Sequence, residues 1–251
     1  MRKRFVSGAL WFLLVCAAGR SAQPLDQVFN TDYGFSMRLP ADWREVPADV
    51  LAPLNEKMSE ASHIPQHWQY AYQLRSAEHW LAYPYILVQF YPGRKSEASF
   101  KSQFEAKSQM QEELKDASDK ASGAVSNPRV GTYYYDEASR KVEFVTEMNL
   151  SGIGKSEAYT ALKLTENGVI EFCGYCTADD QVDSISFFKN VANNIQLPES
   201  SVYKPRILEQ IPFLGALDWP AEKVGVVVGF AVGFLLILVF RPLMKKSGPP
   251  K

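Results

Sequence analysis

The most reactive pair of side chains in the sequence is Cys173 and Cys176, in the run Cys-Gly-Tyr-Cys. Such a pair forms a redox disulfide when backbone amides and a helix N-terminus lower the pKa of one thiol. Redox pairs follow an early strand and open a helix directly, whereas this pair comes late, at the end of a predicted strand. A bridge would also need a turn or bulge at Gly174, because residues three apart on a strand face opposite sides.

Three interpretations of the two cysteines stay open: a structural disulfide, two separately packed thiols, or a thiol–disulfide oxidoreductase. Other chemistry finds little support in the sequence. Two thiols without a nearby histidine are too few for zinc, and Pro65 separates His63 from His67. The Gly-Lys-Ser at 154–156 lacks the first glycine of a phosphate loop. We therefore expect no enzymatic activity, no cofactor and no metal site.

One apolar stretch indicates a membrane anchor. Residues 224–240, VGVVVGFAVGFLLILVF, contain no charged side chain, and Lys223 and Arg241 flank them. A helix needs about 20 apolar residues, and at least ~17, to cross ~30 Å of hydrocarbon. Trp219 and Leu243 can extend the apolar run into the headgroup region. We predict a transmembrane helix over 223–242 rather than a buried core helix.

Charges on either side of this helix predict its orientation. The tail at 243–251 carries lysines and no acid, which is typical of the cytoplasmic side. The first 22 residues begin Met-Arg-Lys-Arg and continue with an apolar run, as a signal peptide does. The alternative is a retained signal anchor. We expect a single-pass protein whose N-terminal domain is extracytoplasmic, or periplasmic if the host is Gram-negative.

Three glycines recur at every fourth position of the predicted helix, at Gly225, Gly229 and Gly233. This spacing places them along one helix face, where small residues allow a second helix to approach closely. Glycine is also common in membrane helices generally. The pattern favours packing against a partner membrane helix, or a homodimer.

The formal charge of −1 hides a strong asymmetry. Residues 23–222 contain all 28 acids and only 18 of the 27 basic residues, a net charge of −10. An acidic domain argues against nucleic acid and against adhesion to anionic lipid. Basic surfaces of other proteins remain suitable partners.

Periodicity between the two apolar segments predicts an α+β domain. Alternating patterns indicate strands, and apolar residues three and four apart indicate helices. We predict domain boundaries at 23–200, followed by a juxtamembrane stalk at 201–222. The predicted elements are strands at 33–39, 67–75 and 81–91, helices at 47–62, 96–120 and 180–196, and four antiparallel strands within 129–177.

The opening run DYGFSMRLPADWREV, with Tyr33, Phe35 and Trp43, resembles the start of the PsbP-like family. A closing hairpin followed by the helix SISFFKNVANNIQL is similar to that family's end, so the likeness covers roughly 30–197. The family includes an extrinsic photosystem II subunit, Ran-binding Mog proteins and bacterial envelope relatives. The resemblance implies an α/β/α sandwich, an antiparallel sheet flanked by helices, here with one C-terminal transmembrane helix added. It also implies binding and assembly of other proteins, with no catalytic set.

These observations favour a membrane-anchored binding or assembly domain that acts through protein–protein contacts. Membrane proteins, reached through the transmembrane helix and the acidic domain, are the expected partners. The alternatives are the oxidoreductase that uses Cys173 and Cys176 and a small-ligand or lipid-binding envelope protein.

Overall fold

The computed structural model describes residues 24–62, 67–105, 111–112, 114–116, 118, 125–178 and 181–206. The predicted signal peptide at 1–22, the transmembrane helix at 223–242 with its three glycines, and the tail at 243–251 lie outside these residues. Within the described part, none of the helices has the length and apolar character that a membrane crossing requires.

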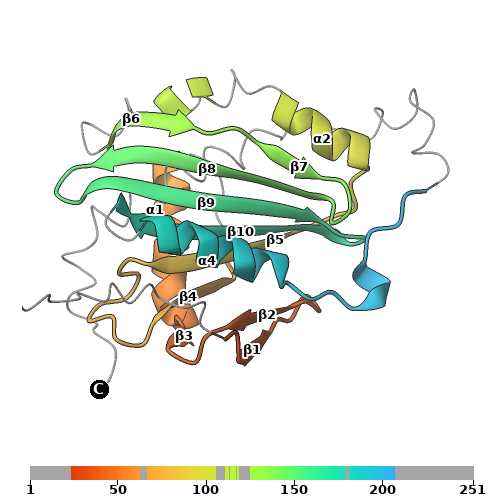
Figure 1. The fold of residues 1–251 in the computed structure, drawn as a ribbon, viewed down its shortest axis with the longest axis horizontal. Coiled ribbons are helices and arrows are strands. Elements are labelled where there is room, and N and C mark those ends of the chain that lie inside the picture. Colours follow the sequence, from red (N-terminus) through yellow and green to blue (C-terminus); the bar gives the residue numbers. More distant parts are fainter. Residues whose placement is uncertain are drawn as a thin grey trace, which may run out of the picture.

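The described elements are groups of strands separated by single helices (Figure 1). In order they are β1 (Gln27–Asn30), β2 (Ser36–Leu39), β3 (Trp43–Glu45), α1 (Ala48–Ser62), β4 (Tyr70–Leu74), β5 (Tyr85–Pro92), α2 (Glu97–Glu105), β6 (Val125–Val130), β7 (Tyr134–Asp136), β8 (Lys141–Leu150), β9 (Gly154–Leu164), β10 (Gly168–Thr177), α4 (Gln181–Asn193) and a 3₁₀ turn at Glu199–Ser201.

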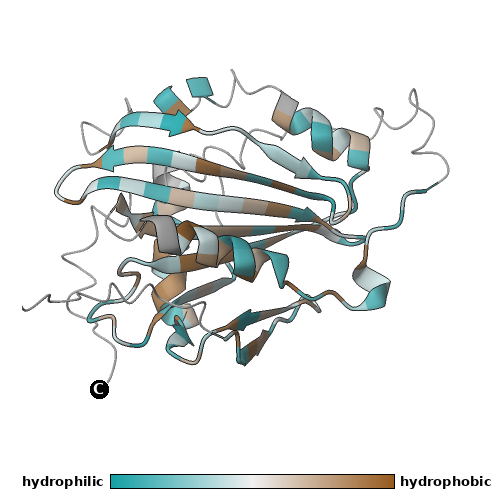
Figure 2. Ribbon diagram, in the orientation of Figure 1, coloured by the Kyte–Doolittle hydropathy of each residue, from teal (hydrophilic) through white to brown (hydrophobic). Residues whose placement is uncertain are grey.

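Most strands belong to one antiparallel sheet. Its order is β3-β4-β5-β10-β9-β8-β6, with β7 paired to the other half of β8. A separate hairpin of β1 and β2 lies beside it (Figure 1). Figure 2 shows the central strands as the most hydrophobic part of the sheet, with more hydrophilic positions toward β6. The predicted α+β class with a large antiparallel sheet is confirmed.

Each face of the sheet has its own core. Leu51, Leu54 and Met58 of α1 and Phe100 and Phe104 of α2 are buried on one face. The other face is covered by α4 and by the β1–β2 hairpin, whose buried residues include Phe188, Val191, Met37 and Leu39. The apolar stripes predicted for the three helices are the surfaces that these helices bury against the sheet.

An ion cluster helps to hold α4 on its face. The carboxylate of Glu143 on β8 lies 2.6 Å from Lys189 Nζ of α4 and 2.6 Å from Lys141 Nζ, and it accepts a hydrogen bond from Tyr159 at 2.8 Å. Lys141 also donates to Asn193 of α4. Burial by itself would raise the pKa of Glu143, but hydrogen bonds from Lys141, Lys189 and Tyr159 outweigh it and lower that pKa.

Three strands, β1, β3 and β6, were absent from the prediction, and the strands observed as β2, β4 and β5 were predicted to start too early. The strand predicted at 33–39 begins at Ser36, because Thr31 to Gly34 form a turn in which the Gly34 amide donates to Thr31 O at 3.2 Å. The residues before the turn then pair back as β1. The second omission, β3, has only three residues and a single apolar one, Trp43, so it shows almost no alternation.

The outer strand β6 is irregular. Its register with β8 shifts between Ser126 and Arg129, and Asn127 has a φ of 53°. Pro128 lies within the strand and has no backbone N–H to donate. The side chain of Gln111 forms hydrogen bonds with two backbone groups of β6, donating to Pro128 O and accepting from Val130 N–H, each at 2.9 Å. A bulge and a proline on an edge strand discourage pairing with other strands.

The glycine of Cys-Gly-Tyr-Cys has a packing role. The ring of Phe188 on α4 lies directly over Gly174, so a Cβ added there would come within 2.2 Å of the ring. Gly174→Ala should therefore lower the free energy of unfolding by about 1–3 kcal/mol through overpacking, measured by chemical denaturation. In a Phe188→Leu background the same substitution should cost clearly less. An equal cost in both backgrounds would show that the ring is not the reason.

Candidate functional site

The two cysteines lie on opposite faces of β10. Cys173 belongs to the core under α1 and α2, and Cys176 to the core under α4, and both thiols are fully buried. β10 pairs with β9 without interruption from Val169 to Thr177. The bulge at Gly174 that a bridge would require is therefore absent, and the two cysteines form no disulfide.

The surroundings of Cys173 are polar but closed to solvent. Its thiol lies 3.7 Å from Oε1 of Glu171, a side chain that is 1% exposed. Burial raises the pKa of Glu171 to about 8, which keeps the carboxyl protonated at neutral pH. Burial and the neighbouring Glu171 raise the pKa of Cys173. A nucleophilic cysteine needs the opposite shift and access to substrate.

The described residues contain no arrangement of side chains that could bind a metal ion. No group of three or more His, Cys, Asp or Glu side chains there is placed to hold an ion. Of the two histidines considered, His67 is exposed, and His63 lies outside the described residues.

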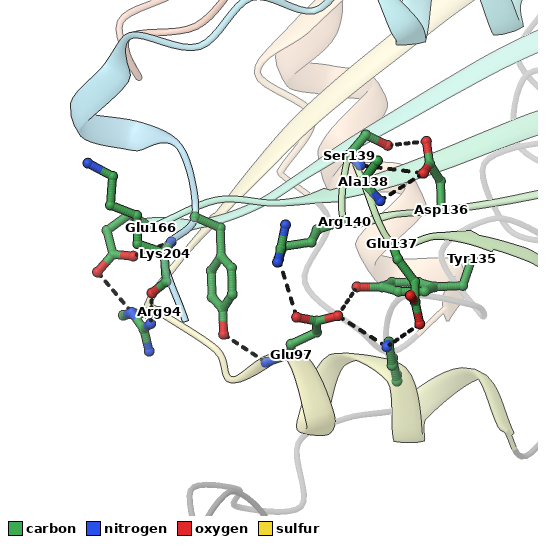
Figure 3. Close-up of polar contacts among 12 residues, drawn as sticks. Arg94, Glu97, Tyr135, Asp136, Glu137, Ala138, Ser139, Arg140, Glu166 and Lys204 are labelled. Atoms are coloured by element: carbon green, nitrogen blue, oxygen red, sulfur yellow. Dashed lines mark hydrogen bonds and ion pairs between the residues drawn. The ribbon is translucent and has the colours of Figure 1, made fainter. Parts of the chain in front are cut away.

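A cluster of polar side chains lies around the end of the described chain. Here Arg94, Glu97, Arg140 and Glu166 surround the segment 202–206 and Tyr203 within it; we call these five residues the C-terminal clamp (Figure 3). Arg94 comes from the turn after β5, Glu97 from the start of α2, Arg140 from the turn before β8, and Glu166 from the turn between β9 and β10. Three connections remote in sequence, β5–α2, β7–β8 and β9–β10, thus meet on one short segment.

Glu166 and Arg94 hold the backbone of this segment. The Glu166 carboxylate accepts from Arg94 Nε at 2.9 Å and from the Lys204 amide at 3.3 Å, and Arg206 lies 3.5 Å away. Arg94 also donates to Lys204 O at 2.9 Å, so both backbone polar groups of Lys204 are bound. Farther back, the Glu166 amide donates to Ser201 O at 3.0 Å. The segment is attached through main-chain groups as well as side chains.

Tyr203 is the apolar centre of the clamp. Its side chain is 5% exposed and belongs to the core under α1 and α2. The guanidinium groups of Arg94 and Arg140 lie 5.0 Å and 5.7 Å from its ring centroid, within the range of cation–π attraction. Its hydroxyl accepts from the Glu97 amide at 3.0 Å, which satisfies a donor at the start of α2.

Glu97 connects the clamp to the β7–β8 turn. Its carboxylate accepts from Tyr135 at 2.8 Å, Lys101 at 3.1 Å and Arg140 at 3.2 Å (Figure 3). Desolvation alone would raise the pKa of Glu97, but the hydrogen bonds from Tyr135 and Lys101 and the charge of Arg140 outweigh it and lower the pKa. The ionised form is therefore the one that the fold stabilises.

The clamp residues did not stand out in the sequence. Four of them are single charged residues in turns or at a helix start, separated by up to 72 positions, and such charges are usually solvated. The available signal was Tyr203, an aromatic residue soon after the last predicted helix. The segment 201–206, assigned to the stalk from sequence, packs onto the domain, with Ser201 and Tyr203 both buried.

Comparisons with known proteins leave the family open. No family model and no curated protein matches this chain. Among solved structures, it is similar to cyanobacterial PsbP (CyanoP) from Synechocystis sp. PCC 6803, with 14% identity over 74% of this chain and 99% of that one and a TM-score of 0.47. A crystal structure from Bacteroides thetaiotaomicron has 11% identity over 87% of this chain and 79% of that one, with a TM-score of 0.39. Both scores lie below 0.5, so the PsbP-like resemblance stays a prediction.

The buried thiols predict a specific labelling pattern. In the folded protein Cys173 and Cys176 should resist iodoacetamide at neutral pH, and both should be alkylated after denaturation without any reductant, as mapped by peptide mass spectrometry. Ser76→Cys, at an exposed position, is the positive control for reagent access. Rapid labelling of Cys173 in the folded chain, or a need for reductant, would contradict this geometry.

Glu97 should contribute to stability in a pH-dependent way. Glu97→Gln should lower the free energy of unfolding at pH 7 by about 1 kcal/mol, since a partly buried charged hydrogen-bond acceptor is lost. Because the folded-state pKa is lowered, this stabilisation is present above the ordinary pKa of 4.5 and is lost as pH falls through the folded value. The two proteins should converge in stability once the pH lies below the folded-state pKa of Glu97.

The matched control is Glu137→Gln. That carboxylate lies 3.5 Å from Lys101, but it is 83% exposed, so its loss should change stability little at either pH. If both substitutions changed the free energy of unfolding equally, the contacts of Glu97 with Tyr135, Lys101 and Arg140 would not stabilise the fold.

Proposed function

We propose that this protein is a membrane-anchored, extracytoplasmic binding domain that helps to assemble a membrane-protein complex without catalysis. The observation that carries the proposal is the C-terminal clamp. It fixes the chain up to Arg206 against the domain, eighteen positions before the apolar run at 224–240 begins. A domain whose exit segment is fixed has a more restricted orientation relative to its anchor than one on a flexible linker.

Two further features support a binding role. The part of the sequence between the apolar segments is strongly acidic, and electrostatic complementarity would favour a basic protein surface as its partner. Gly225, Gly229 and Gly233 would let the anchor pack closely against a helix of the same partner. The thiol–disulfide alternative lacks geometric support, since Cys173 and Cys176 lie on opposite faces of β10.

The experiment is a pull-down of the tagged full-length chain in mild detergent. Membrane subunits should copurify with the wild type, and Gly225→Leu, Gly229→Leu and Gly233→Leu combined should reduce their recovery severalfold because helix contact is lost. The control triple variant, Val227→Leu, Ala231→Leu and Leu235→Ile, changes the opposite side of the helix and should retain the partner. Failure of the wild type to recover any membrane protein would overturn the proposal.

The clamp is tested separately by Glu166→Gln. This change weakens the contacts to Arg94, Lys204 and Arg206 and should lower partner recovery severalfold while the chain remains in the membrane fraction. Glu147→Gln removes a half-exposed carboxylate paired with Lys155 and should leave recovery unchanged. Equal recovery from all three proteins would show that the clamp has no part in binding.

A further inference from the structure

A small cavity lies beside the clamp, between the β7–β8 turn, the end of β9 and the segment that follows α4. Its volume is about 220 Å³, and the charged side chains that line it are Arg140 and Lys163. Leu164, Leu197 and Tyr203 supply apolar walls, and Ser139 lies at its border. Since a water molecule takes about 30 Å³ of liquid, the space corresponds to about seven waters and suits a ligand of roughly that many non-hydrogen atoms.

Lys163 has no counter-ion among the described residues. Its Nζ donates to Ile195 O at 3.3 Å, and no carboxylate there forms an ion pair with it. Burial, and then the charge of Lys141, lower the pKa of Lys163. The charge of Asp136 raises the pKa of Lys163. The oxygens of Asp136, however, accept hydrogen bonds from the Ala138 amide at 3.0 Å and from the Ser139 hydroxyl at 2.7 Å.

The neighbouring cations each have a carboxylate partner. Lys141, directly opposite Lys163 in the register of β8 and β9, is paired with Glu143 at 2.6 Å. Arg140 gives its Nε to Glu97 at 3.2 Å, which leaves the other nitrogens of its guanidinium as donors. Of the two cations that line the cavity, Lys163 is therefore the one without a carboxylate partner among the described residues, and a half-buried cation is costly unless an anion joins it.

We propose that this cavity binds a monocarboxylate with a short apolar body, its carboxylate held by Lys163 and Arg140. The single negative charge of a carboxylate matches the one lysine of the cavity, which lacks a carboxylate partner among the described residues. A phosphate dianion would instead place an additional negative charge near Glu97 and Asp136. The apolar part of the ligand would lie against Leu164, Leu197 and Tyr203. Two sources offer this chemistry, a free small organic acid and the C-terminal residue of a peptide. The site does not depend on the proposed assembly role.

The test is isothermal titration calorimetry on the full-length protein in a neutral detergent. The free-acid probe is 4-methylpentanoate, with 4-methylpentanamide as its uncharged match. The peptide probe is acetyl-Gly-Gly-Leu with either a free or an amidated C-terminus. Saturable binding of a carboxylate probe, with at least tenfold weaker binding of its amide, is the expected result. The probe that binds identifies the source.

Three variants assign the site. Lys163→Met should weaken carboxylate binding about tenfold or more, and Lys163→Arg, which keeps the charge, should restore most of it. Lys155→Met removes a cation from the opposite end of β9 and should not change the affinity. The proposal is overturned if neither carboxylate binds saturably, if acid and amide bind alike, or if Lys155→Met weakens binding as much as Lys163→Met.

Discussion

The uninterrupted pairing of β10 is the constraint on which the rest of the structure depends. This strand lies between β5 and β9, and its residues from Gly168 to Cys176 are all buried. Its side chains alternate strictly between two cores, one under α1 and α2 and the other under α4. A shift of one residue would exchange every side chain between these cores, so the helices on both faces also depend on this register.

The clamp extends this order to the end of the described chain. The turns that carry Arg94, Glu166 and Arg140 adjoin paired strands of the sheet, so the sheet sets the positions of their charges. Preorganised donors and acceptors lose less entropy on contact than flexible ones do. Burial of Tyr203 adds an apolar contribution to the ionic contacts. The segment is thus part of the folded domain, although its sequence resembles a linker.

Strong local patterns accounted for most of the fold. The stripe on α4 and the hairpin signal at Asn167-Gly168 predicted real elements, because each follows from periodicity or turn geometry alone. The three-residue strand β3 and the broken strand β6 were not predictable in this way. Their positions depend on partners distant in sequence. A three-residue strand shows too few alternations to be recognised, and the bulge near Asn127 destroys the alternation of β6.

The candidate site was less accessible to sequence reasoning than the fold. Cys173 and Cys176 attracted attention because their spacing resembles a redox motif, yet the geometry of a flat strand separates them. The residues that do come together, such as Arg94, Glu97 and Glu166, share no motif. Their proximity is a property of the strand order, which places three turns at one end of the sheet. Pairings of that kind become visible only after the topology is known.

The irregular edge strand β6 would have a consequence for a protein anchored to a membrane, as proposed for this one. Copies confined to two dimensions meet far more often than copies in free solution, and an open strand edge would then allow chains to join edge to edge. In this domain Pro128 has no N–H to offer another strand, and the side chain of Gln111 is hydrogen-bonded to Pro128 O and Val130 N–H, two backbone groups that edge-to-edge pairing would use. This edge therefore favours individual copies even where they are crowded, and it leaves association to surfaces that recognise a specific partner.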